Sequence, residues 1–116
     1  MILAVVYLVV RFDTISLPEE GCSPVRAIAP GARILLDLRP AEVGLGDAVL
    51  FRSADTALLL GVVAELPQSA PQGYHQRVQA GELWIVADNP SCPARDSRAL
   101  GPVSRADLAG RVVLTF

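Results

Sequence analysis

Few residues in this chain have side chains that can act as a nucleophile or as a base. Ser23 and Cys22 are neighbours in the segment Gly21-Cys22-Ser23-Pro24, and His75 is the single histidine. A serine hydroxyl is a weak nucleophile at neutral pH and needs a neighbouring base to take its proton. All 10 basic residues are arginine, so the chain contains no lysine. The sequence thus offers a hydroxyl or a thiol for covalent chemistry without an evident partner base.

The two cysteines leave two interpretations open. Cys22 and Cys92 lie far apart in the chain, each beside turn-forming residues, and their number and spacing do not fit a metal site. A disulfide closing so long a loop would stabilise the fold by about 4 kcal/mol, less any strain. Two buried free thiols are the alternative. We expect no metal and no cofactor, because the chain has no ligand cluster, cofactor-binding loop or paired-carboxylate spacing.

Composition and punctuation predict a small all-β domain over residues 1–116. The chain is 52% hydrophobic but only 5% aromatic, which favours aliphatic packing in a sheet. Proline and glycine interrupt short apolar runs every eight to fifteen residues or so, a pattern typical of strands. We expect strands at residues 5–17, 33–37, 48–52, 57–65, 82–87 and 111–116, one helical turn at 104–108 with Ser104 as its N-cap, and a polar loop outside the core at 67–81.

The most apolar stretch, Ile2 to Val10, is closed by Arg11 and is far shorter than the roughly 20 residues of a membrane-spanning helix. It is a buried strand, the remnant or end of an anchor within residues 1–17, or a short signal-peptide core. The net charge is −2 and the arginines are scattered, so the sequence has no basic stripe for phosphates. We therefore expect no nucleic-acid partner.

Four segments, in order, resemble the type I signal peptidase family of serine–lysine endopeptidases. Residues 21–37 are similar to the block that carries the family's nucleophile, with Ser23 at its position, and residues 44–52 to the strand that follows a Gly-Asp turn. Residues 58–67 resemble the strand that normally carries the lysine. The tail is most similar to the small nickel superoxide dismutase maturation proteases, with Asp88-Asn89-Pro90, Asp96-Ser97-Arg98, Gly101-Pro102-Val103 and Gly110-Arg111-Val112-Val113.

The resemblance implies a signal-peptidase/LexA-like domain of short, coiled strands with at most one short helix, but its catalytic positions differ. Leu60 and Gly61 stand where the family has Lys-Arg, and Pro24 replaces the methionine after the nucleophile. Leucine cannot accept a proton, so the covalent part of catalysis is expected to be lost while a binding surface persists. Two rescues are open: His75 as the base, because histidine replaces lysine in one branch of the family, or Cys22 as the nucleophile.

The tail residues are expected to be structural. Asp96 and Arg98 are predicted to pair on one side of an extended segment and pin it to the sheet, with Ser97 between them. Asp88 and Asn89 are predicted turn formers, and Gly101 and Gly110 are expected to serve backbone conformation. If Cys22 and Cys92 pair, the resemblance implies that the bridge ties the nucleophile loop to the turn of the tail.

The leading expectation is a catalytically degenerate signal-peptidase-like domain that acts as a binding or scaffold module. It would be an accessory subunit on the extracytoplasmic face of a membrane, with a membrane protein complex, the membrane surface or peptide segments as partners. The alternative is an active serine endopeptidase of the signal peptidase or maturation protease type that uses Ser23 with a base other than lysine.

Overall fold

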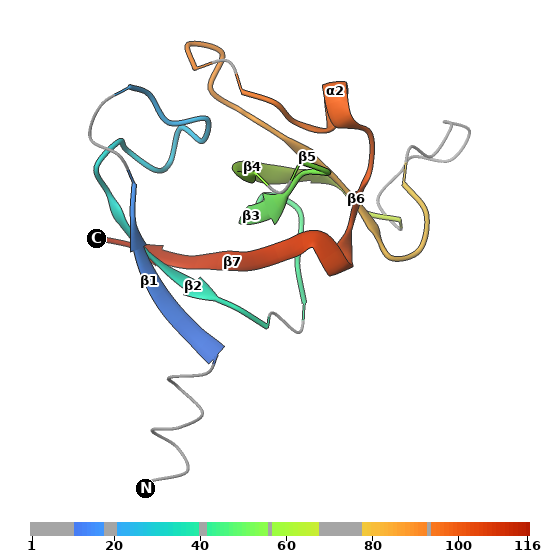
Figure 1. Cartoon of the computed structure of the whole chain (residues 1–116), viewed down its shortest axis with the longest axis horizontal. Helices are drawn as coiled ribbons and strands as arrows, with labels where there is room; N and C mark the ends of the chain where they lie inside the picture. Colours follow the sequence, from blue (N-terminus) through green and yellow to red (C-terminus); the bar gives the residue numbers. More distant parts are fainter. Residues whose placement is uncertain (1–10, 18–20, 40–41, 56, 68–77, 93) are drawn as a thin grey trace, which may run out of the picture.

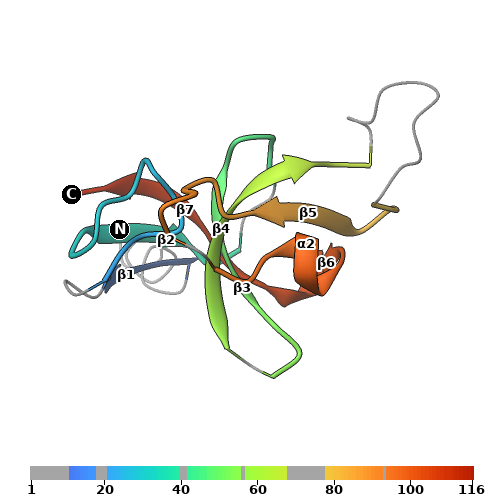
Figure 2. The ribbon, with the colours of Figure 1, turned by 90° about the horizontal axis from the view of Figure 1, so that it is seen from above.

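The computed structural model describes residues 11–17, 21–39, 42–55, 57–67, 78–92 and 94–116. Its described strands form a single antiparallel, seven-stranded sheet with the order β1-β2-β7-β3-β4-β5-β6, which curls strongly (Figures 1 and 2). The strands are β1 Phe12–Ser16, β2 Arg33–Asp37, β3 Ala48–Arg52, β4 Leu58–Glu65, β5 Glu82–Val86, β6 Val103–Ser104 and β7 Leu108–Thr115. The all-β prediction is confirmed.

Two short helical elements interrupt the strands near the carboxyl end. The 3-10 turn η1, Arg105–Asp107, follows its N-cap Ser104, whose hydroxyl accepts a hydrogen bond from the Ala106 amide, as the sequence predicts. The helix α2, Ser97–Leu100, is different: residues 96–98 were expected to be extended. That expectation is wrong, because Asp96 is an N-cap and Gly101, with φ of 83°, ends the helix.

Most predicted strand limits agree with the structure. The limits of β2 and β3 match, β4 and β5 each differ by one residue, and β7 begins three residues earlier than expected. The strand expected from residue 5 begins at Phe12, after Arg11, and residues 5–10 lie outside the described part of the chain. The loop at 67–81 was expected to stay outside the core, but Val78 is fully buried, so this expectation fails at that residue.

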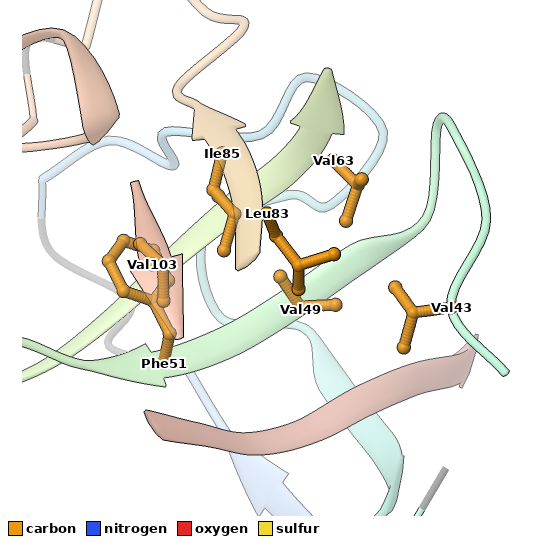
Figure 3. Packing of buried hydrophobic residues seen from close by; sticks show 7 residues of the cluster. All are labelled: Val43, Val49, Phe51, Val63, Leu83, Ile85 and Val103. Atoms are coloured by element: carbon orange, nitrogen blue, oxygen red, sulfur yellow. The ribbon is translucent and has the colours of Figure 1, made fainter. Parts of the chain in front are cut away.

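The sheet packs a hydrophobic cluster on each of its two faces. Side chains of a strand alternate between faces, so in β3 Val49 and Phe51 enter one cluster and Leu50 enters the other. The first cluster lies between β3, β4, β5 and β6 and comprises Val43, Val49, Phe51, Val63, Leu83, Ile85 and Val103 (Figure 3). The second cluster comprises Val25, Ile28, Ile34, Leu36, Leu50 and Leu60, so it includes the loop that follows Ser23.

Strand β7, the last in sequence, pairs with both β2 and β3 and so holds the two halves of the sheet together. A Cβ atom at Gly110 would lie 3.1 Å from the Asp37 carbonyl oxygen, so this glycine permits a close approach of β7 to β2. The reason for glycine at this position is therefore packing, since no positive φ is found there.

Asp37, at the end of β2, is a buried carboxylate held by arginine. Arg11 Nε and Nη2 each donate to it at 3.0 Å, the Arg39 amide donates at 3.0 Å, and Arg111 Nη2 lies 3.9 Å away. The hydrogen bonds from Arg11 hold the pKa of Asp37 below its ordinary value, although burial opposes this. The group fastens the start of β1 to β2 and β7, and the sequence analysis did not single it out.

Candidate functional site

The loop that carries Ser23 is tied to the turn at residues 88–92. Cys22 and Cys92 form a disulfide with an S–S distance of 2.08 Å, so of the two interpretations of the cysteines the structure contains the bridge. Asn89 reinforces it, because its side-chain amide donates to the Ser23 carbonyl at 2.9 Å and its backbone amide donates to the Pro24 carbonyl at 3.1 Å. The two segments therefore form one unit in spite of their separation in the sequence.

Asp88 and Asn89 contribute to this unit in different ways. Asn89 Oδ1 accepts a hydrogen bond from the Ser91 amide, which is the local turn expected for such a residue. Asp88 Oδ1 instead accepts from the amide of Arg26, 62 positions away, at 2.8 Å. The expectation of a local turn at Asp88 is therefore replaced by a long-range contact with the Ser23 loop.

The hydroxyl of Ser23 is engaged with its own loop. The residue is 5% exposed, its Oγ donates to the Val25 carbonyl at 2.9 Å, and the Val25 amide donates back to Oγ at 3.3 Å. This is a local side-chain-to-backbone turn, and it satisfies the hydroxyl as donor and as acceptor. No base contacts Oγ among the described residues, so nothing there would take its proton.

Ser23 and Leu60, the two positions where the family resemblance expects nucleophile and base, line the same cavity. It has a volume of about 250 Å³. The Ser23 loop, the segment after Cys92 and the first half of β4 contribute to its walls. The lining residues are Leu17, Cys22, Ser23, Pro24, Pro30, Leu50, Leu58, Leu59, Leu60 and Ala94. No lining residue has a titratable side chain, since Cys22 is disulfide-bonded. We call this cavity the Ser23–Leu60 pocket.

Among the described residues, the first half of β4 has a strand partner on one side only. Leu58 to Leu60 pair with Arg52, Phe51 and Leu50 of β3, whereas the described pairing of β4 with β5 starts at Val62 and continues towards Glu65. Gly61 marks the change, because a Cβ atom there would lie 2.5 Å from Ile85 Cγ2 and 3.1 Å from the Val86 carbonyl oxygen. The edge of β4 next to the Ser23–Leu60 pocket is therefore without a strand partner in the described chain.

The sequence leaves two alternatives for catalysis, His75 as the base and Cys22 as the nucleophile, and the structure bears on Cys22. Cys22 is part of the disulfide, so it has no thiolate to act as a nucleophile in this oxidised form. His75 lies outside the described residues. A base for Ser23 therefore stays unassigned.

The tail motif holds the turn of residues 87–96 against the sheet. Asp96 is 3% exposed. Its carboxylate accepts a hydrogen bond from the Ala87 amide at 2.8 Å and forms an ion pair with Arg98 Nη2 at 2.6 Å. Arg98 Nη2 also donates to the Ala87 carbonyl at 3.2 Å. The predicted pairing of Asp96 with Arg98 is therefore present, and both residues contact Ala87 at the end of β5. The pair forms across the first turn of α2, however, and not along an extended segment.

Burial of Asp96 opposes its ionisation, but hydrogen bonds from Arg98 and from the Ala87 amide outweigh burial and lower its pKa. Ser97, 1% exposed, accepts a hydrogen bond from the Ile85 amide at 2.9 Å through its Oγ. Both side chains therefore substitute for a strand partner beside β5. These hydrogen bonds hold the segment that leads into α2 against the end of β5.

A second, larger hollow is lined by Cys92, the other cysteine of the disulfide. Its volume is about 710 Å³, and it is lined by Val86, Ala87, Asp88, Asn89, Pro90, Cys92, Ala94, Asp96, Arg98 and Ala99. Ala94 borders both the hollow and the Ser23–Leu60 pocket. Nothing in the sequence distinguishes Ala94 or Leu17 as site residues, because an alanine or leucine acquires this role only through the position of its neighbours.

Across the described residues, no group of His, Cys, Asp and Glu could hold a metal ion, and no helix has the length and apolarity to span a membrane. Comparison of the chain with protein-family models and with curated proteins finds no match.

Proposed function

We propose that this chain is a signal-peptidase-like domain without peptidase activity that binds an extended peptide segment at the Ser23–Leu60 pocket. The observation that carries the proposal is the shared cavity: the nucleophile and base positions of the family motif meet in one pocket whose walls contain no titratable side chain. Such a site retains the means to hold a peptide and lacks the means to activate a hydroxyl.

The pocket and the adjoining strand edge suit an extended peptide. At about 250 Å³ the pocket is smaller than the roughly 300–1,000 Å³ of sites for drug-sized molecules, so an apolar side chain of a peptide is the appropriate occupant. The edge at Leu58 to Leu60 offers backbone groups for strand addition beside that pocket. Backbone hydrogen bonds would supply affinity, and the apolar pocket would select the side chain.

The state of Ser23 supports a binding role over a catalytic one. Its hydroxyl already donates to the Val25 carbonyl, and an attack on a substrate would require that bond to break without a base to receive the proton. The side chain at the base position, Leu60, is 8% exposed and belongs to the second hydrophobic cluster. The position that the resemblance assigns to the base is therefore occupied by a core side chain.

We further propose that the domain serves as an accessory subunit of a membrane protein complex on the extracytoplasmic face. The disulfide supports this location, because such bonds persist in oxidising compartments and are rare in the cytosol. The nine-residue apolar run that precedes Arg11 supports contact with a membrane, although it is too short to cross one.

Fluorescence anisotropy with a labelled, extended peptide rich in alanine, valine and leucine tests the binding role. Leu58 is 52% exposed and lines this pocket but not the larger hollow, so Leu58→Trp should obstruct the pocket without disturbing the core and weaken binding at least about tenfold. Ala54→Trp, at an exposed position in the turn between β3 and β4, is the matched control and should bind like wild type. Equal affinities for the three proteins would refute the pocket.

Incubation of the same peptide and of secreted precursor peptides, followed by mass spectrometry, tests the absence of activity. We expect no cleavage product. Cleavage after small residues that disappears in Ser23→Ala would overturn the proposal in favour of an active serine endopeptidase.

A further inference from the structure

The part of the sheet formed by β1, β2 and β7 (Figure 1) carries exposed apolar side chains on one face. Leu114 lies opposite Leu35 in the β2–β7 register, and Phe116 exchanges backbone hydrogen bonds with Arg33 two residues further on. Residues two apart in a strand share a face, so Leu35, Leu114 and Phe116 lie side by side. Leu114 is 46% and Phe116 63% exposed, high values for large apolar side chains.

The same register places basic residues on this face. Arg33 is exposed beside Phe116, and Arg111 and Phe12 lie opposite Asp37. Arg11 stacks over the Phe12 ring at 5.4 Å. Asp37 lies on this face as well, but it is buried and paired with arginine. The face is therefore positively charged although the chain has a net charge of −2.

The edge of β1 is poorly suited to receive a further strand from a second copy of the chain. The backbone amides of an edge strand point alternately towards and away from its partner. The hydrogen bonds from the Leu38 amide to the Arg11 carbonyl and from the Leu17 amide to the Ala32 carbonyl fix this alternation in β1. The Thr14 amide therefore points away from β2. The side chain of Asp13 accepts a hydrogen bond from that amide at 2.8 Å. A charged residue that covers an edge amide in this way disfavours strand addition, so a partner would meet the face and not the edge.

We infer that this face, defined by Leu35, Leu114, Phe116 and Arg33, docks on an anionic lipid surface. Exposed apolar side chains would enter the interface while the arginines meet acidic headgroups, the combination that holds a protein on a membrane without spanning it. The inference rests on the membrane association in the proposed function and is independent of the peptide pocket.

Co-sedimentation of the full chain with phosphatidylcholine vesicles, with and without about one third phosphatidylglycerol, tests the inference. Wild type should bind the anionic vesicles, and added salt should weaken the binding. The double variant Leu114→Ser/Phe116→Ser should lose about tenfold in partitioning, because roughly half of each side chain is free to be buried. Arg33→Gln should lose about fivefold on anionic vesicles and little on neutral ones.

Leu45→Ser is the matched control, since Leu45 is 56% exposed but lies in the turn before β3. It should bind vesicles like wild type, and circular dichroism should show that all variants are folded. Failure of wild type to bind any vesicle would overturn membrane association altogether. If wild type and the double variant bind the vesicles equally, the assignment of this face as the docking surface is wrong. The same conclusion follows if light scattering shows a wild-type dimer that the double variant does not form. Peptide anisotropy, which should be unchanged in these variants, reports separately on the pocket.

Discussion

Removal of the disulfide should lower the stability of the domain strongly and mainly through the unfolded chain. The bridge joins residues 70 positions apart, and the loop that it closes contains β2, β3, β4 and β5. For a loop of this length the chain-entropy relation gives about 4 kcal/mol at 25 °C. With an unfolding entropy of about 2.1 cal/mol/K per residue over 116 residues, the midpoint of thermal unfolding should fall by about 15 °C.

The perturbation is the double variant Cys22→Ser/Cys92→Ala, where alanine avoids placing a hydroxyl at Cys92, which is 5% exposed. Urea denaturation followed by circular dichroism measures the free energy of unfolding. Reduced wild type is the control and should match the variant, and the variant itself should not respond to the reductant.

The Ser23 loop should stay in place in the native state of this variant. Three hydrogen bonds still tie the loop to the turn, two donated by Asn89 and one that Asp88 accepts from the Arg26 amide, each contributing about 1 kcal/mol. The fold and peptide affinity should therefore be retained at 25 °C. A loss of less than about 1 kcal/mol would refute the loop-entropy reasoning, and a native variant that no longer binds peptide would refute the role given to the hydrogen bonds.

Three further predictions concern single residues. Asp37→Asn should lower the free energy of unfolding, measured by urea denaturation, by about 2–3 kcal/mol. Because the folded-state pKa of Asp37 lies below the ordinary value of 3.8, wild type should lose this contribution as the pH falls below about 5. If the stability of the variant falls equally steeply in acid, the assignment is wrong. Gly61→Ala should cost about 1–3 kcal/mol because its Cβ would meet Ile85, whereas Gly44→Ala, with its nearest contact at 3.7 Å, should be close to neutral; equal effects would disprove the steric argument. Ser23→Ala should cost about 1 kcal/mol and leave peptide affinity within twofold, and a larger loss of affinity would give the hydroxyl a direct role in binding.

The strands whose signals are local were predicted best. The apolar run of β2 lies between Gly31 and Pro40, and that of β3 lies between Gly46 and the polar residues that start at Ser53, so both limits could be read from the sequence. Ser104 likewise predicts the turn η1, because an N-cap side chain accepts a hydrogen bond from an amide only a few residues after it. Helix α2 was missed although Asp96 and Gly101 are capping residues, because the pairing of Asp96 with Arg98 was interpreted as a property of extended backbone.

Contacts between distant segments could not be predicted in the same way. Strand β6 has only two residues and exists through its pairing with β5, and Val78 is buried although its neighbours in sequence are polar. The burial of Asp37 depends on Arg11 and Arg111, which lie far from it in the chain. None of these features has a local pattern that would reveal it.

By itself the sequence determined the all-β class, the positions of most strands along the chain and the absence of lysine, because residue type and short-range periodicity decide these properties. The tertiary structure alone decided which residues share a site. The register of β4 on β3 and the disulfide at Cys22 bring Ser23 and Leu60 to one pocket, and the insertion of β7 between β2 and β3 forms the open face at Leu114 and Phe116. The physical reason is that burial on both faces of the sheet selects one register among the many that local propensity allows.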